Sequence, residues 1–246
     1  MLYQPPQLSR WLSREERDRL GAALPAAAAG ARPDRVPWPR VLRSRGCYSL
    51  ILARFLSDPV IYFVIFWLPA YLQKERGFDL AAVGKYAWVP YVFGDIGYVL
   101  GGWMSGRLMR AGWSLPKARK AAMTAGACLM PAAILAPLAP SAPFAVAAMC
   151  LVVFGHAVWV AILLTLPTDL FHGGEVGTAT GFSGAGGAVG GILANLATGY
   201  VVSNFSYLPV FVVAGLMHPL SLVLVYVLLP DRYFSRQPGD REPATT

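Results

Sequence analysis

Charged side chains are scarce in this sequence. Asp, Glu, Lys and Arg together make up 14% of its 246 residues, whereas hydrophobic residues make up 56%. A soluble domain usually carries about 25% charged residues. The deficit is concentrated after residue 48, where the apolar runs reach the roughly 20 residues that a helix needs to cross a bilayer. The composition therefore argues against a soluble protein and predicts an integral membrane protein.

Cysteine is also scarce, and its pattern excludes several kinds of site. The three cysteines show no CxxC spacing, and Cys128 and Cys150 fall inside apolar runs, where cysteine behaves as a small hydrophobic residue. This predicts no disulfide framework, no metal site and no cofactor. Residues 1–20 are polar and charged, so we expect no signal peptide and expect insertion to begin at the first spanning helix.

Motifs for catalysis at membrane depth are missing. The sequence contains no GxSxG, HExxH or paired-aspartate motif, which argues against a membrane enzyme such as an intramembrane protease. No repeat of the kind that builds an ion-selectivity filter is visible either, which disfavours a channel. We therefore predict that the protein is not an enzyme.

Positive charge is abundant but unevenly placed. The formal net charge is +8, with nine arginines between Arg10 and Arg45 and five basic residues between Arg107 and Lys120. These groups flank apolar runs, as expected from the positive-inside rule, and do not indicate nucleic-acid binding. The opposite side of the predicted helices holds only Lys74, Arg76 and Lys85. We therefore predict that both termini are cytoplasmic. The loop FHGGEVG at 171–177 carries no Lys or Arg and gives no information on the orientation.

The pattern along the chain predicts an all-α membrane protein with about six transmembrane helices. Residues 1–47 are expected to form a basic cytoplasmic linker segment, partly disordered, in which Ser13 caps a short helix and Glu16 completes a capping box. LPAAAAGARPDR at 24–35 is of low complexity. A six-helix bundle follows at 48–230 and a cytoplasmic tail at 231–246. The predicted spans are about 48–72, 84–109, 118–138, 144–167, 177–203 and 207–229.

The fifth predicted span is rich in glycine, and its glycines recur at four-residue spacing. Small residues at this spacing let helix backbones approach closely in lipid. The pattern favours static helix packing and is also compatible with a helix that moves against a partner during transport. The pairs are Gly177 with Gly181, Gly186 with Gly190, and Gly187 with Gly191.

Ionisable residues in the first two spans are candidates for function, because burying charge in hydrocarbon is unfavourable. Asp95, inside the second span, is a candidate for proton coupling or gating, or for a hydrogen bond to a neighbouring helix. Arg54 and Asp58 are four residues apart, which places them on one helix face where they can neutralise each other. Contact of Arg54 with a substrate anion is the alternative.

The later spans hold four further candidates. His156 and Trp159 share a face of the fourth span; His156 could line a cavity and carry a proton, and Trp159 could stack on a sugar ring, or both could simply pack. Pro167 is expected to bend the end of that span. Asp169 beside it is a candidate for proton coupling or gating; the alternatives are solvation at the interface and a salt bridge to the basic loop at 107–120. Asn195 in the fifth span could bond a ligand hydroxyl or another helix.

Four stretches carry a family resemblance. In their order and spacing they resemble the C-terminal half of a major facilitator superfamily transporter of the anion:cation symporter family, and are most similar to bacterial hexuronate transporters. The stretches are DPVIYFVIFWLPAYLQKERGFDL at 58–80, WVPYVFGDIGYVLGGWMSGRLMRAGWSLPKARK at 88–120, HAVWVAILLTLPTDLF at 156–171 and GTATGFSGAGGAVGG at 177–191.

The resemblance implies a function and a site. Such proteins move a sugar acid or related organic anion with protons, by two six-helix bundles that rock about a site at the membrane midplane. The family's tryptophan of the tenth helix corresponds to Trp159, and the polar position one turn earlier to His156. Asn195 is the candidate for the polar contact of the eleventh helix.

The resemblance also implies that something is missing. A family member has about twelve helices, and its main anion-binding and proton-carrying residues lie in the N-terminal bundle. We therefore expect a missing N-terminal six-helix half as a partner, in a bacterial inner membrane, together with an organic anion and protons. The chain alone is expected not to transport; the alternative is an inactive membrane fragment.

Overall fold

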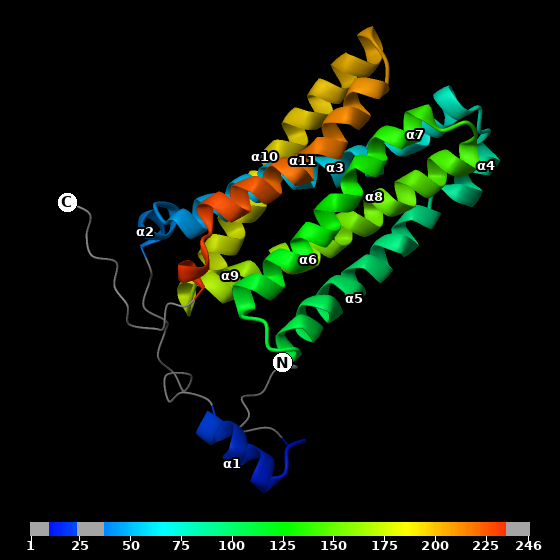
Figure 1. Ribbon diagram of the computed structural model, residues 1–246. Helices are drawn as coiled ribbons and strands as arrows, with labels where there is room; N and C mark the ends of the chain where they lie inside the picture. The colour runs from blue at the N-terminus through cyan, green and yellow to red at the C-terminus, as the bar shows by residue number, and fades with distance from the viewer. Residues whose placement is uncertain (1–9, 24–36, 235–246) are drawn as a thin grey trace. The chain divides into compact units, whose positions relative to one another are not determined.

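The computed structural model describes residues 10–23 and 37–234 (Figure 1). Within these ranges the regular structure is helical and no strand occurs. The chain divides into two units, Met1–Arg35 and Val36–Thr246. The low-complexity segment predicted at 24–35 and most of the predicted tail lie outside the described residues.

The first unit contains helix α1, Arg14–Ala23. The backbone N–H of Ser13 donates to the Glu16 carboxylate at 2.9 Å, and the backbone N–H of Glu16 donates to the Ser13 hydroxyl at 3.2 Å. These reciprocal bonds confirm the predicted capping box. The hydrogen bond from the Ser13 backbone also lowers the pKa of the Glu16 carboxyl, because it stabilises the charged form.

The second unit is a bundle of long helices joined by short ones. Its long helices account for all six predicted spans, with the third divided among three successive helical segments. The elements are α2 Trp38–Leu42, α3 Arg45–Arg76, α4 Leu80–Tyr86, α5 Val89–Arg110, α6 Leu115–Leu129, η3 Met130–Ile134, α7 Leu135–Leu138, α8 Ala142–Leu163, α9 Leu166–Leu170, α10 Gly174–Asn204, α11 Leu208–Leu228 and η4 Asp231–Tyr233.

Five helical stretches in the described residues are long and apolar enough to cross a membrane: Arg45–Arg76, Leu115–Leu138, Ala142–Leu170, Gly174–Asn204 and Leu208–Leu228. The remaining predicted span corresponds to α5. Its 22 residues extend over about 33 Å, which is long enough, but its glycines and the charged Asp95 and Arg107 reduce its apolar content.

Prolines explain where the helices break. The predicted second span begins at residue 84, but the structure ends α4 at Tyr86 and starts α5 at Val89, with Pro90 in its first turn. Proline has no N–H to donate and favours this position. Pro131 similarly lies at the start of η3, and Pro167 in the first turn of α9, as the sequence predicted for the end of the fourth span.

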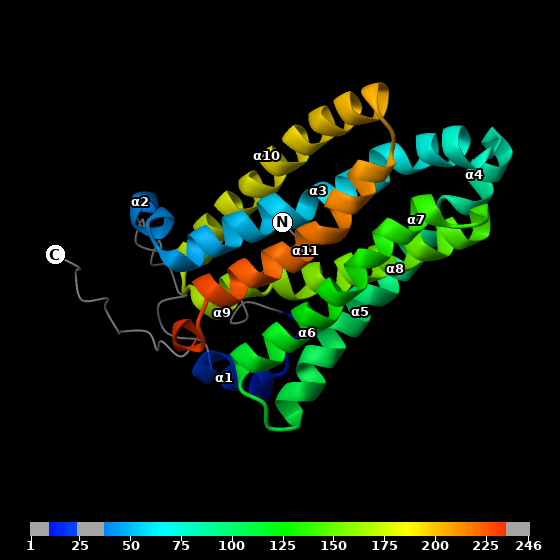
Figure 2. The same ribbon diagram turned by 45° about the horizontal axis from the view of Figure 1, so that its top comes forward.

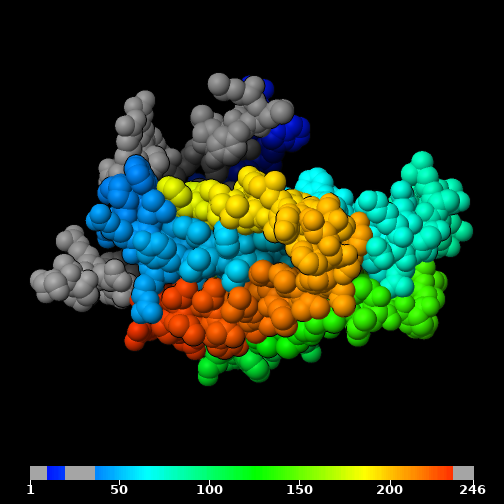
Figure 3. Space-filling model, turned by 90° about the horizontal axis from the view of Figure 1, so that it is seen from above, coloured from blue at the N-terminus to red at the C-terminus, as the bar shows by residue number. Residues whose placement is uncertain are grey.

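The bundle is built around α3 and α8. Helix α3 packs against α10 and α11, whereas α8 packs against α5 and α6, and Figures 1 and 2 show these helices side by side. Figure 3 shows α3 between α10 in yellow and α11 in orange. The interior is apolar, and includes an edge-to-face contact of Phe63 with Phe211 at 5.0 Å between ring centroids. Helices α5 and α10 therefore flank a central pair, α3 and α8.

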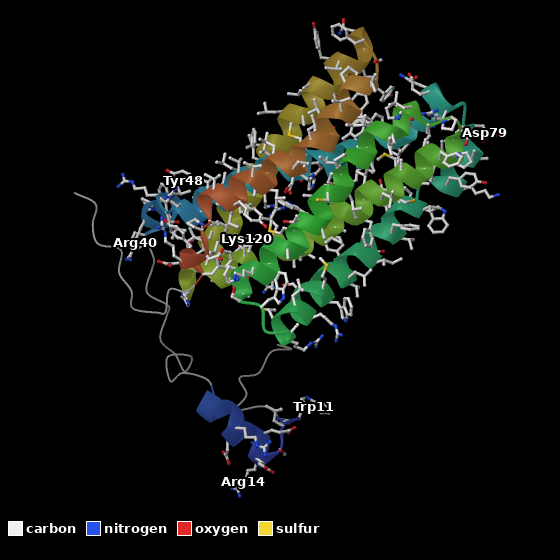
Figure 4. The ribbon with its side chains drawn as sticks, viewed as in Figure 1. Trp11, Arg14, Arg40, Tyr48, Asp79 and Lys120 are labelled. Atoms are coloured by element: carbon white, nitrogen blue, oxygen red, sulfur yellow. The ribbon has the colours of Figure 1, made fainter. Side chains whose placement is uncertain are left out.

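The two ends of the bundle differ in charge. Figure 4 shows Arg40, Tyr48 and Lys120 near one end and Asp79 at the other. Helix α5 ends at the same end of the bundle as Lys120, with Arg107 and Arg110 in its last turn. Most of the basic residues of the bundle therefore gather at one end.

Candidate functional site

The seam between α3 and α10 is lined by glycines of α10. A Cβ atom added to Gly186 or Gly190 would overlap the backbone of α3, and one added to Gly187 or Gly191 would overlap side chains of α3. These four glycines therefore let α10 approach α3 more closely than any larger residue allows. Nothing lies within 4 Å of a Cβ placed on Gly177 or Gly181, so that pair makes no such contact.

Two of these glycines make room for polar side chains of α3. A Cβ on Gly187 would overlap the carboxylate of Asp58, and one on Gly191 would overlap the ring of Tyr62. A Cβ on Gly184 would lie 3.6 Å from Nη1 of Arg54, an ordinary contact distance. The glycine face of α10 therefore lies directly on a polar face of α3.

The predicted pairing of Arg54 with Asp58 is confirmed. Nε of Arg54 donates to Oδ2 of Asp58 at 2.8 Å, and Nη2 lies 2.7 Å from the same oxygen. The Asp58 side chain is 7% exposed and that of Arg54 is 22% exposed. The carboxylate is thus nearly enclosed between α3 and α10, while the Arg54 side chain is less completely buried.

A cleft begins one helical turn beyond this ion pair. Asp58, Tyr62 and Phe66 follow at four-residue spacing on α3, and the Tyr62 and Phe66 rings are stacked, with centroids 6.3 Å apart and planes 10° apart. Tyr62 and Phe66 form one wall of a cleft, and α10 forms the other. The cleft has a volume of about 580 Å³, which is within the range of small-molecule sites. The lining residues are Tyr62, Phe66, Ala188, Gly191, Ile192, Asn195 and Leu196.

Asn195 lines this cleft and also bonds another helix. Its side-chain oxygen accepts a hydrogen bond from Nε1 of Trp67 on α3 at 3.0 Å, and its Nδ2 donates to the carbonyl of Gly191 at 2.9 Å. The interhelical alternative is therefore present in the structure. Contact with a ligand hydroxyl remains a prediction, and the position of Asn195 in the cleft is compatible with it.

His156 and Trp159 lie elsewhere, in the packed interior of the bundle. His156 is 3% exposed and Trp159 is fully buried. Nδ1 of His156 is 3.0 Å from Nε2 of His218 on α11, and the Trp159 ring meets His218 edge-on at 5.5 Å between centroids. The structure thus brings these two predicted residues together, but apart from the cleft that holds Asn195. Their substrate contacts remain a prediction, and in this conformation both are out of reach of a solute.

His218 is a residue that the sequence reasoning missed. It is fully buried in α11, and its Nδ1 has no hydrogen-bond partner among the described atoms. The signal was the same as for His156, since it is also a lone histidine in an apolar span. Trp67 and Tyr62 were missed because aromatic residues in such spans carry no distinguishing signal.

Asp95 is exposed on α5. Helix α5 packs on α8 through Gly94, Gly97 and Gly101, whose added Cβ atoms would meet α8 closely. The Asp95 carboxylate thus lies on the exposed side of α5, away from the glycine contact with α8. Its role in coupling or gating stays a prediction.

Asp169 belongs to a charged cluster at the basic end of the bundle. Its carboxylate accepts two hydrogen bonds from Arg119 at 2.8 and 3.3 Å, and Arg119 also donates to the Ser105 hydroxyl at 3.1 Å. The structure thus confirms the predicted salt bridge between Asp169 and the basic loop. Through Arg119 it connects α9 to α5 and α6. Nearby on α6, Lys120 contacts Asp231 at 2.7 Å.

Comparison with known proteins agrees with this architecture. The profile of the Major Facilitator Superfamily matches residues 2–194 and, in an overlapping match, 117–245. The hexuronate transporter of Escherichia coli K12 is 28% identical over 233 residues, which is 94% of this chain and 54% of that protein. A D-galactonate transporter of Escherichia coli O6:H1 is 27% identical over 93% of this chain and 54% of its own length. The galacturonate transporter of Dickeya chrysanthemi is 32% identical over 52% of this chain. The chain spans about half the length of the first two.

Proposed function

This chain belongs to the Major Facilitator Superfamily, and on that premise we propose that it serves as the C-terminal half of a transporter for carboxylated sugars. Its substrate class would be hexuronates or related organic anions, moved together with protons. The main support is the alignment with a hexuronate transporter, which covers 94% of this chain and 54% of that transporter. The other relatives named above also have sugar-acid transport in their names.

The geometry supports this substrate class. A sugar acid needs a cation for its carboxylate, aromatic faces for its ring and amides or hydroxyls for its hydroxyl groups. The seam between α3 and α10 offers the partly exposed Arg54, the stacked rings of Tyr62 and Phe66, and Asn195 on the cleft wall. His156 and Trp159 then act behind the site, in the interior, and a direct contact by either needs the bundle to open.

We propose further that the protein lies in a bacterial inner membrane with the basic end of the bundle in the cytoplasm. In this arrangement α5 also crosses the membrane, shielded along one face by α8. Both termini are then cytoplasmic as well, because an even number of spans returns the chain to the side from which it started. The positive-inside rule supports this orientation, because Lys120 and the last turn of α5, with Arg107 and Arg110, lie at that end.

Transport requires a second bundle. In alternating access, two six-helix halves rock about a site between them, and one half alone has nothing to rock against. The partner we propose is an N-terminal six-helix half. Asp95 and the Asp169–Arg119 pair are our candidates for coupling and for gating at the cytoplasmic end.

The test combines gene context with uptake. Roughly 600 bases upstream of the Met1 codon suffice to encode six more spans of about 20 residues with their loops. If these bases encode six such spans, proteoliposomes that contain that half together with this chain should take up radiolabelled glucuronate when the outside is more acidic than the inside. Proteoliposomes with this chain alone should not. Uptake by this chain alone would contradict the need for a second half. A complete assembly that takes up no sugar acid would contradict the proposed function.

A further inference from the structure

A second hollow lies between α10 and α11, with α3 as its floor. Its volume is about 330 Å³, and Figure 3 shows α3 lying between the two other helices. The floor includes Phe55, Pro59 and Phe63, which share one face of α3 because they follow at four-residue spacing. The walls come from residues 190–201 of α10 and 209–217 of α11. We refer to this hollow as the apolar groove.

The apolar groove is separate from the cleft that holds Asn195. The cleft is lined from α3 by Tyr62 and Phe66, and neither residue lines the groove. On α10, Gly190 lines the groove and Gly191 lines the cleft, and successive residues of a helix point about 100° apart. Helix α10 therefore lies on α3 with the cleft along one side and the groove along the other.

The lining of the groove suits hydrocarbon. Of the described residues that line it, none is charged and Thr198 is the one with a polar side chain; Thr198 is only 6% exposed. A sugar acid in the groove would lose its hydrogen bonds with water and find no replacement, which is strongly unfavourable. The groove therefore calls for an apolar occupant.

The length of the groove matches the hydrocarbon of one leaflet. All three of its helices are among the stretches long and apolar enough to span a bilayer. At 1.5 Å per residue, the wall at 190–201 is about 17 Å long and the wall at 209–217 is about 12 Å long. The hydrocarbon core of a bilayer is about 30 Å thick, so one leaflet contributes about 15 Å. An acyl chain of one leaflet therefore has the length that the groove accommodates.

The position of the groove indicates which leaflet this is. Helix α10 ends at Asn204 and α11 begins at Leu208, and their connection lies at the end of the bundle away from Arg40 and Lys120 (Figures 1 and 4). Both walls run from the middle of their helices toward this connection. The groove therefore lies in the half of the bundle opposite the basic end.

The volume of the groove distinguishes between apolar occupants. One turn of an α-helix with its side chains is about 10–12 Å wide and 5.4 Å long, which corresponds to roughly 400–600 Å³. This is more than the whole groove. A helix of a second copy or of another protein can therefore cover the groove but cannot enter it. A single unbranched hydrocarbon chain is narrow enough to do so.

We propose that the apolar groove holds one acyl chain of a bilayer phospholipid, from the leaflet opposite the basic end. The chain lies along α3 and fills the space between α10 and α11. Its many weak contacts with the lining are collectively large, so the lipid stabilises the packing of these two helices. This goes beyond the proposed function and does not depend on which solute is moved, because it concerns the side of α10 that faces away from the cleft.

The test is native mass spectrometry of the purified chain, extracted into mild detergent from membranes of phosphatidylethanolamine and phosphatidylglycerol. The wild type should retain one phospholipid per chain. Ala197 and Val213 both line the groove and are exposed, so a larger residue at either position extends into the groove without disturbing the buried interior. In Ala197→Phe and in Val213→Phe the ring should take the place of the acyl chain, and the retained lipid should be lost.

A matched control and a second measurement make the result specific. Val189→Phe adds the same ring to an exposed position of α10 that lies outside the groove, and it should retain lipid like the wild type. Removal of the lipid by prolonged detergent exchange should lower the Tm of the wild type and of Val189→Phe. It should leave the Tm of Ala197→Phe unchanged, because the phenylalanine already fills the groove.

Photo-crosslinking locates the retained lipid. Phosphatidylglycerol with a diazirine in the middle of an acyl chain, irradiated after extraction, should label residues 55–63, 190–201 or 209–217 of the wild type. Labelling confined to other residues would contradict the proposal. So would a folded wild type that carries no phospholipid, or groove variants that retain as much lipid as the wild type. If one groove variant fails to fold, the other decides. A lipid-free wild type that is dimeric, with monomeric groove variants, would instead make a second copy the occupant.

Discussion

At the scale of single residues, the main determinant of the site is the match between glycines of α10 and large side chains of α3. Gly187 leaves room for the Asp58 carboxylate and Gly191 for the Tyr62 ring. The spacing of the glycines predicted a close approach of two helices, but a spacing along one chain defines a face and does not name the helix opposite. The identity of α3 as the partner came only from the structure.

Gly187→Ala should destabilise the bundle, because the new methyl group would overlap the Asp58 carboxylate. Overpacking of this kind costs about 1–3 kcal/mol. Gly181→Ala is the matched control, since nothing lies within 4 Å of a Cβ there. Thermal unfolding of the purified chain in detergent should show a lower Tm for the first variant alone. Equal shifts in the two would mean that the α3–α10 contact is not as close as described.

His218→Ala should also lower stability, because it removes the partner of His156 Nδ1 and leaves a buried polar group unpaired, a loss of about 1–3 kcal/mol. His172→Ala, in the exposed turn before α10, should have little effect. Urea titration of the two variants separates them. If His218→Ala is as stable as the wild type, the imidazole pair contributes nothing to holding α8 against α11.

At the scale of elements, the sequence predicted the helices well and their interruptions less well. The predicted fifth and sixth spans, 177–203 and 207–229, differ by at most a few residues from α10 and α11. The predicted second span ran through the break between α4 and α5, because the apolar pattern continues across Trp88 and Pro90. Interactions between elements, such as Asn195 with Trp67, could not be derived, since they depend on how helices distant in sequence are paired.

Asp169→Asn should loosen the basic end of the bundle, because Arg119 then loses its charged partner. Both side chains of this pair are largely buried, at 14% and 12% exposed, so a loss of roughly 1.5–3 kcal/mol is expected. Amide hydrogen exchange in α9 and at the start of α6 should become faster. In the control Glu15→Gln, which breaks a pair exposed at 78% and 76%, the effect should stay below about 1 kcal/mol. Unchanged exchange in Asp169→Asn would show that the cluster does not fasten α9.

At the scale of the whole molecule, the uneven charge of the two ends predicts an orientation. In a variant without native cysteines, Lys74→Cys in the last turn of α3, at its proposed external end, should react with a membrane-impermeant maleimide added to intact cells. Trp113→Cys, in the turn between α5 and α6, should react only after the membrane is opened. The reverse pattern would place the basic end outside and contradict the proposed topology. Both positions are exposed in the structure, so a lack of reaction reports on the membrane and not on burial within the protein.

The fold class and family were accessible from the sequence because they rest on composition and on the order of motifs along the chain. The candidate site was accessible in part. Asn195 and the Arg54–Asp58 pair were found because polar groups stand out in apolar spans. The cleft was not, since Tyr62 and Phe66 look like any other aromatic residues until α10 lies beside them. His156 and Trp159 share a face, as predicted, but the sequence could not tell which way that face points.

The glycine seam also sets how this protein tolerates change over evolution. Along α10, replacement of Gly186, Gly187, Gly190 or Gly191 meets α3 at once, whereas the neighbouring side chain of Val189 is half exposed. A library of all single substitutions should therefore show tolerance that rises and falls with the turn of the helix. Asp58 and Gly187 should also be free to vary only as a pair, since a smaller residue on α3 is what makes a larger one on α10 acceptable.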